Sequence, residues 1–157
     1  MKHTIQALVE NKFGVLARIA SLFSARGYNI ESLAVGETQD STVSCMTIVV
    51  DTSDEKILEQ IKKQLNKLID VIQVVDFTKR EYIDKELFLA KIDKNKKDRE
   101  VIDNLVKKYP VEIVEDAVNY YILEIRADRH NIDDILKELR KLGVQELART
   151  GRLAIGK

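Results

Sequence analysis

One order of predicted strands and helices occurs twice along this 157-residue chain, and it limits the folds that the chain can adopt. In the first half, alternating apolar side chains indicate strands, and apolar side chains spaced three or four residues apart indicate helices. The resulting order is strand, helix, strand, strand, helix, strand. The expected strands cover 3–9, 29–38, 43–51 and 71–77, and the expected helices cover 15–26 and the segment from a cap at Ser53 or Asp54 to a break at Asp70.

The second half repeats this order after the charged segment "TKREYIDKE", residues 78–86. Its strands are expected near 86–93, in "VEIVEDA" and "NYYILEIRA", and over about 144–155, and its helices around 101–106 and over 131–142. The two halves share this order of elements but no residue-level identity. Together they predict an α+β protein of two ferredoxin-like βαββαβ domains in tandem, residues 1–77 and 78–157. Right-handed crossovers place both helices of a domain on one sheet face. The other face and the sheet edges then need polar side chains or partners.

Composition and charge exclude several classes of protein. Basic and acidic residues both number 26, so the formal net charge is zero, whereas a nucleic-acid binder usually carries a basic surplus. No apolar run approaches the roughly 20 residues that span a bilayer. The opening residues "MKHTIQALVEN" lack the apolar block of a signal peptide. The single Cys45 cannot form an internal disulfide, which fits a reducing compartment. These observations predict a cytoplasmic protein.

The sequence carries no recognisable catalytic, metal or cofactor motif. His3 and His130 are far apart in sequence, and two lone histidines with one cysteine make a poor metal site. Cys45 lies within a predicted strand, where a packing role is expected. Neither a GxGxxG pattern nor a P-loop is present. The strands that would stack RNA bases contain no aromatic residue. We therefore expect no catalytic and no metal-binding residues.

The turns on either side of the first predicted helix carry the most informative residues. Asn11 and Gly14 precede this helix, and Gly27 and Asn29 follow it. Free backbone N–H groups at a helix start bind anions such as carboxylates. Gly14 would let a ligand approach the backbone closely, and Asn11 offers both a donor and an acceptor. A free amino acid needs this mixture. On spacing alone, however, a cap at Asn11 and a turn at Gly14 are the favoured interpretation.

The stretch "LVENKFGVLARIASLFSARGYNIESL" resembles the opening of the small, regulatory subunit of acetolactate synthase. The form "ENxxGVLxRIxxLFxxRGYNIESLxV" is specific to that family rather than to ACT domains in general. The later segments "SCMTIVV", "LEQIKKQLNKLIDVIQV" and "ELARTGRLAI" are similar to it as well. The likeness covers nearly the whole chain and is strongest over 4–76. Cys45 stands where family members often carry arginine.

This resemblance implies a regulatory protein that is not itself an enzyme. The first half would be an ACT domain that pairs side by side with a second copy in a homodimer. Valine, the end product of the pathway, would bind at that interface. Asn11, Gly14, Val15 and Leu16 would come from one chain, and Asn29 and Ile30 from the other.

The resemblance also implies a catalytic partner. The large subunit would carry thiamine diphosphate, Mg²⁺ and FAD, with no cofactor in the present chain. It would condense two pyruvates, or pyruvate with 2-ketobutyrate. The small subunit would raise this activity and confer inhibition by valine.

Two other functions are compatible with the predicted fold. A free-standing ACT domain could sense an amino acid and control another enzyme or transcription, but the family-specific "GYNIESL" and the lack of a helix-turn-helix disfavour this. A small enzyme of the same fold, such as an acylphosphatase, needs an arginine in a glycine-rich phosphate loop. The segment "ENKFGVLAR" is not such a loop.

Overall fold

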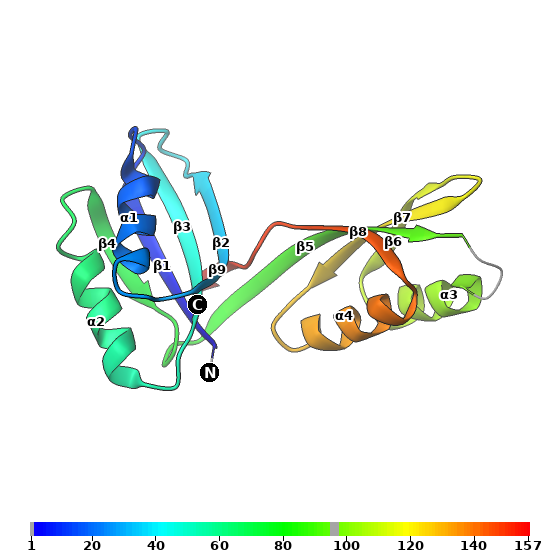
Figure 1. The fold of residues 1–157 in the computed structure, drawn as a ribbon. Helices are drawn as coiled ribbons and strands as arrows, with labels where there is room; N and C mark the ends of the chain where they lie inside the picture. Colours follow the sequence, from blue (N-terminus) through cyan, green and yellow to red (C-terminus); the bar gives the residue numbers. More distant parts are fainter. Residues whose placement is uncertain (1, 95–97) are drawn as a thin grey trace. The chain divides into compact units, whose positions relative to one another are not determined.

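The doubled order of strands and helices is confirmed in the computed structural model, which describes residues 2–94 and 98–157 (Figure 1). The chain divides into two compact units. The first runs to Ile83 and also includes Arg152–Lys157, and the second covers Asp84–Gly151. The boundary predicted after residue 77 lies before the end of the first compact unit at Ile83. The last residues of the chain, Arg152–Lys157, belong to the first unit and not to the second.

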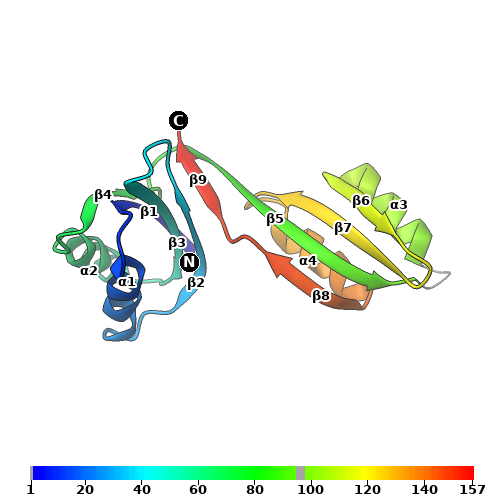
Figure 2. The same ribbon diagram turned by 90° about the horizontal axis from the view of Figure 1, so that it is seen from above.

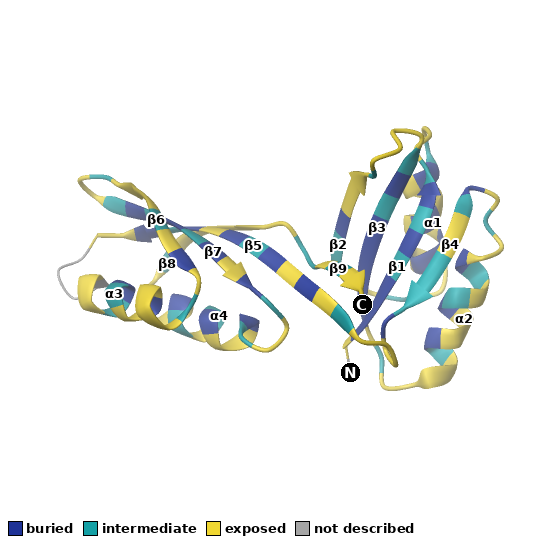
Figure 3. Ribbon diagram, turned by 180° about the vertical axis from the view of Figure 1, so that it is seen from behind, coloured by how far each residue is buried: buried dark blue, intermediate teal, exposed yellow. Residues whose placement is uncertain are grey.

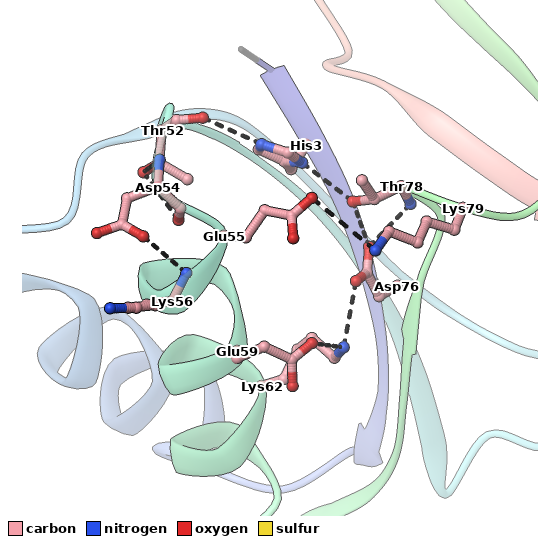
Figure 4. Close-up of polar contacts among 10 residues, drawn as sticks. All are labelled: His3, Thr52, Asp54, Glu55, Lys56, Glu59, Lys62, Asp76, Thr78 and Lys79. Atoms are coloured by element: carbon pink, nitrogen blue, oxygen red, sulfur yellow. Dashed lines mark hydrogen bonds and ion pairs between the residues drawn. The ribbon is translucent and has the colours of Figure 1, made fainter.

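The first unit is a four-stranded antiparallel sheet with two helices on one face (Figures 1 and 3). The strand order is β2-β3-β1-β4, as a βαββαβ unit with right-handed crossovers requires. Its elements are β1 (Lys2–Glu10), α1 (Val15–Ser24), β2 (Ile30–Glu37), β3 (Val43–Asp51), α2 (Glu55–Leu65) and β4 (Val71–Asp76). Of the two predicted cap residues, Ser53 and Asp54, it is Asp54 that caps α2, by accepting a hydrogen bond from the Lys56 N–H at 2.8 Å (Figure 4).

The core of the first unit lies between the sheet and its helices. On β1 the alternate residues His3, Ile5, Ala7 and Val9 are all buried, as the period of two predicts. They pack with apolar side chains of the neighbouring elements, among them Ile19, Phe23, Met46, Ile48, Leu58 and Ile61. This packing fixes both helices, and with them the two turns that flank α1.

The opposite face of this sheet receives the last residues of the chain, β9 (Leu153–Gly156). Gln6 donates to the carbonyl oxygen of Ala154 at 2.9 Å, and Arg152 donates to the Thr4 hydroxyl at 2.9 Å. The Arg152 N–H also donates to the Ser32 hydroxyl at 2.9 Å. Part of the cover that we expected from polar side chains or a partner is thus supplied by this chain itself.

The second unit has the same topology, with strand order β6-β7-β5-β8 and both helices behind one sheet face (Figure 2). Its elements are β5 (Tyr82–Asp93), α3 (Asp98–Lys108), β6 (Val111–Asp116), β7 (Tyr120–Ala127), α4 (Ile132–Lys141) and β8 (Val144–Arg149). Buried and exposed residues alternate along β5 (Figure 3). The predicted fold class, two ferredoxin-like units in tandem, is confirmed.

The predicted single strand over 144–155 was wrong, because it is two strands. β8 ends at Arg149, and Gly151 takes a φ of +79° before β9 begins. A residue in this left-handed region breaks an extended ladder. β9 then returns to the first unit.

We predict that a chain ending at Gly151 keeps a folded first unit of lower stability. The truncated chain loses the pairing of β9 with β5 and three further hydrogen bonds, those of Arg152 and Ala154 to Ser32, Thr4 and Gln6. At about 0.5–1.5 kcal/mol each, these three bonds alone should lower the free energy of unfolding by about 1.5–4.5 kcal/mol. Urea denaturation followed by circular dichroism measures this. The control is Lys157→Ala, which removes an exposed ion pair with Glu81 and should change little. An unchanged midpoint for the truncated chain would contradict the role given to β9.

Candidate functional site

The loop between β1 and α1 is built around Gly14, the N-cap residue of α1. Gly14 has a φ of +82°, a conformation that is costly for other residues. No side chain caps the helix. The N–H of Val15 reaches back to the carbonyl oxygen of Lys12 at 3.3 Å, and the carbonyl oxygen of Gly14 accepts from the Arg18 N–H at 3.0 Å. The start of α1 is therefore shaped by backbone geometry.

Asn11 joins this loop to the hairpin between β2 and β3. Its side-chain nitrogen donates to Glu37 at 3.1 Å and to the carbonyl oxygen of Ser41 at 2.9 Å. Its backbone N–H donates to the carbonyl oxygen of Thr42 at 2.7 Å. The interpretation of Asn11 as the cap of α1 was wrong. Because both side-chain hydrogens are used, Asn11 can offer a ligand its Oδ1 acceptor.

Val15 and Leu16 form the first turn of α1 and differ in exposure. Val15 is 3% exposed and packs in the core, and its backbone N–H is used by the carbonyl oxygen of Lys12. Leu16 is 44% exposed and presents its apolar side chain at the surface. The first turn thus places a buried and an accessible apolar side chain next to each other.

Asn29 and Ile30 lie at the other end of α1. Asn29 is exposed in the turn after the helix, and Ile30 is the first residue of β2, opposite Val50. At 1.5 Å per residue, the ten residues of α1 separate the two helix ends by about 15 Å. One chain therefore groups Asn11 with Gly14, Val15 and Leu16, and keeps the other two predicted site residues apart from them.

Arg18 is a feature of this region that the sequence interpretation missed. Its Nε donates to Asp70 at 2.7 Å, and its Nη1 would lie 3.2 Å from a Cβ at Gly14. Asp70 is buried and stands just before β4. A guanidinium therefore lies beside the start of α1, where it adds to the attraction for an anion. The sequence could have indicated this residue, since Arg18 follows Gly14 by one helical turn and therefore lies on the same side of α1.

β2 is an edge strand of the first sheet. It begins at Ile30 and carries Val35, which is exposed. Leu16 on α1 and Phe13 before it are also exposed. Edge backbone groups and exposed apolar side chains are features that a second copy can cover.

Other groups considered in the sequence do not form a reaction centre. Within residues 2–94 and 98–157, no three histidine, cysteine, aspartate or glutamate side chains gather as metal ligands would. His3 belongs to the first unit and His130 to the second. Burial raises the pKa of the Cys45 thiol, which makes it a poor nucleophile. None of the helices in the described part of the chain is long and apolar enough to cross a membrane.

Comparison with known proteins agrees with this geometry in both halves. Residues 5–73 match the family described as AHAS small subunit-like ACT domain, and residues 85–157 match the family described as small subunit of acetolactate synthase. The first unit is thus an ACT domain, which is the class that its fold defines. The chain as a whole belongs to the acetolactate synthase small-subunit family.

Relatives support this assignment along the full length. The chain is 44% identical over 155 residues to the probable acetolactate synthase small subunit of Archaeoglobus fulgidus, covering 99% of this chain and 96% of that one. It is 37% identical to the acetolactate synthase small subunit of Aquifex aeolicus, covering 98% and 80%. The crystal structure of the small subunit from Thermotoga maritima matches with a TM-score of 0.87 and 33% identity, covering 100% and 98%.

We predict that Gly14→Ala lowers stability without unfolding the first unit. The left-handed backbone costs about 1–2 kcal/mol for alanine, and the added methyl group meets Arg18. Gly36→Ala is the matched control, because a Cβ there meets no atom within 4 Å and its φ is not left-handed. Thermal unfolding of both variants measures the difference. Equal melting temperatures would show that Gly14 is not constrained.

Proposed function

We propose that this chain is the regulatory subunit of an acetolactate synthase and is not catalytic by itself. The observation that carries the proposal is the match to the small-subunit family over both halves of the chain. The partner is the catalytic large subunit, which holds thiamine diphosphate, Mg²⁺ and FAD, whereas this chain holds no cofactor. The chain raises the activity of that partner and makes it sensitive to valine. It works in the cytoplasm, with no nucleic-acid or membrane partner.

The proposed effector site is shared by two copies. Asn11, Gly14, Val15 and Leu16 belong to one chain, and Asn29 and Ile30 belong to the other. The separation of these groups by the length of α1 supports the proposal, since a second chain is needed to bring them together. The edge strand β2 supports a dimer in which two first units pair side by side into one sheet.

The chemistry of the loop also supports an amino acid as the effector. A carboxylate suits the N–H groups at the start of α1 and the guanidinium of Arg18. An ammonium group suits the remaining acceptor of Asn11. A branched apolar side chain suits Leu16, which is exposed in a single copy.

Reconstitution tests the function directly. The chain is mixed with a purified thiamine-dependent catalytic subunit, and acetolactate formation is measured with and without valine. We expect higher activity with the chain and inhibition of the mixture by valine. Unchanged activity would contradict the regulatory assignment. Activation without inhibition by valine would contradict only the proposal that valine is the effector. Pyruvate consumption by the chain alone would contradict its non-catalytic role.

We predict that Gly14→Asp yields a valine-resistant complex that is still activated. The new carboxylate would repel the carboxylate of valine by several kcal/mol at an effective dielectric constant near 20. Even with Arg18 nearby, valine affinity should fall at least tenfold below that of Gly14→Ala, at about 1.4 kcal/mol per factor of ten. Both variants place a side chain at the same left-handed position, so titration calorimetry on the pair tests the effect of the added charge. Equal affinities would place the carboxylate of valine elsewhere.

We predict that Asn11 and Asn29 act from opposite chains. Asn11→Ala and Asn29→Ala should each weaken valine binding, because each removes hydrogen bonds worth about 0.5–3 kcal/mol. A mixed dimer of the two single variants should contain one intact site and one doubly altered site. Calorimetry on tagged mixed dimers should then give one wild-type site per dimer. Two equally weakened sites would mean that both residues serve one site within a single chain.

A further inference from the structure

The side chain of Arg18 on α1 is held at one nitrogen and open at the other two. Its Nε donates to Oδ2 of Asp70 at 2.7 Å. Among residues 2–94 and 98–157, no hydrogen bond or ion pair engages either Nη atom. A guanidinium carries five N–H donors in a rigid fork, so the donors of both Nη atoms are left for water or for a ligand. The side chain is 48% exposed, which gives a ligand access to them.

Asp70 fixes the orientation of this guanidinium. Its side chain is only 11% exposed. Its carbonyl oxygen accepts from the Glu10 N–H at 2.9 Å, which ties Asp70 to the end of β1. Because this carboxylate is buried and its backbone is anchored, it restricts Arg18 before any ligand arrives. An arginine that is restricted in this way loses less side-chain freedom on binding than a mobile surface arginine does.

The open donors of Arg18 lie at the start of α1. Nη1 is 3.2 Å from the position that a Cβ would take at Gly14, the N-cap residue. The N–H of Val15 is already used by the carbonyl oxygen of Lys12 at 3.3 Å. The helix start therefore offers an anion one backbone donor fewer than a free helix N-terminus would. The guanidinium stands where it can supply the missing donors.

The charges around this position also favour an anion. Residues 11–30 carry three basic side chains, those of Lys12, Arg18 and Arg26, and no aspartate or glutamate. Lys12 is paired with Glu10 at 2.9 Å, and Arg18 with Asp70. The positive end of the α1 dipole adds to the field at the helix start. A guanidinium can bind carboxylates on more than one edge, so the contact with Asp70 leaves room for a second carboxylate.

We propose that Arg18 makes the effector site selective for ligands with a free α-carboxylate, which it binds through its Nη donors, and that Asp70 is its positioning residue. This inference rests on the effector site proposed above and adds the group that the site requires of its ligand. A free amino acid carries that group. An amino acid amide, an ester or a residue inside a peptide does not, and the site rejects them.

A purely structural role for Arg18 makes a different prediction. The bond to Asp70 also ties α1 to the segment between α2 and β4, and loss of this tie would lower stability. It would not change which of two ligands the protein prefers. The preference between a ligand with a carboxylate and a matched ligand without one therefore separates the two roles.

Valine and valinamide are the probes, and titration calorimetry on the full-length chain measures their affinities. At about pH 6 the α-amino group is protonated in both, so they differ only in the carboxylate. We expect the wild type to prefer valine. Arg18→Gln keeps a donor for Asp70 but removes the Nη fork, so valine affinity should fall about ten- to a hundredfold while valinamide affinity stays close to that of the wild type.

Arg80→Gln is the matched control. Arg80 is an exposed arginine of the same unit, in the segment after β4. Antiparallel pairing of β1 with β4 places this segment near the start of β1, whereas Asn11 follows the end of β1. The same substitution there should keep the preference for valine. Loss of the preference in Arg80→Gln as well would mean that the positive charge of the whole unit selects the ligand, and this would overturn the role given to Arg18.

Asp70→Asn tests the positioning role. It keeps the shape of the side chain but removes the charge that holds Nε, so the preference for valine should shrink. Adding Asp70→Asn to Arg18→Gln should cause no further loss of valine affinity, because Asp70 acts through Arg18. This double variant leaves no buried charge unpaired, so it replaces Arg18→Gln if the single variant does not fold.

The outcomes separate this inference from the proposal on which it rests. No binding of valine by the wild type would overturn the effector site and this inference with it. Valine binding without a preference over valinamide would overturn this inference alone. A preference for valine that survives in Arg18→Gln, even with a lower melting temperature, would show that Arg18 is only a structural tie.

Discussion

Burial of one face of β1 against α1 and α2 is the interaction on which the rest of the first unit depends. His3, Ile5, Ala7 and Val9 occupy this face and are buried without exception. Since α1 is fixed against them, the turns at its two ends are fixed as well. The same packing therefore sets the distance between the two groups of proposed effector residues. It also brings Arg18 on α1 beside Asp70, which stands just before β4.

Much of this architecture follows from local patterns in the sequence. The alternation on β1 and the helical spacing on α1 predicted their elements well, because each is amphipathic with a single buried face. Asp54, one of the two cap residues considered with Ser53, does cap α2, since capping is a local hydrogen bond. The break at Gly151 was not predicted, because the adjoining segments continue to look like a strand. The return of β9 to the first unit depends on long-range contacts of Gln6 and Arg152 that no local pattern encodes.

The effector site stays a prediction, and the structure shows the local geometry of its residues. Gly14 was identified as a special backbone position, and its left-handed φ agrees. Asn11 was given a cap as its alternative role, but the distant hairpin residues Glu37 and Ser41 claim its side chain instead. Arg18 was overlooked although it follows Gly14 by one helical turn, and its contact with Asp70, 52 residues away, becomes visible only in the folded unit. Sequence spacing therefore singled out Asn11 and Gly14, whereas their contacts became visible only in the tertiary structure.

The central claim is that valine binds to a site that no single chain contains. The most direct test follows valine binding and molecular mass together while the protein is diluted, by combining calorimetry with analytical ultracentrifugation. The account predicts one valine per chain in the dimer, loss of binding as the dimer dissociates, and tighter association when valine is present. Saturable binding of valine by a monomer, with an affinity independent of protein concentration, would contradict it.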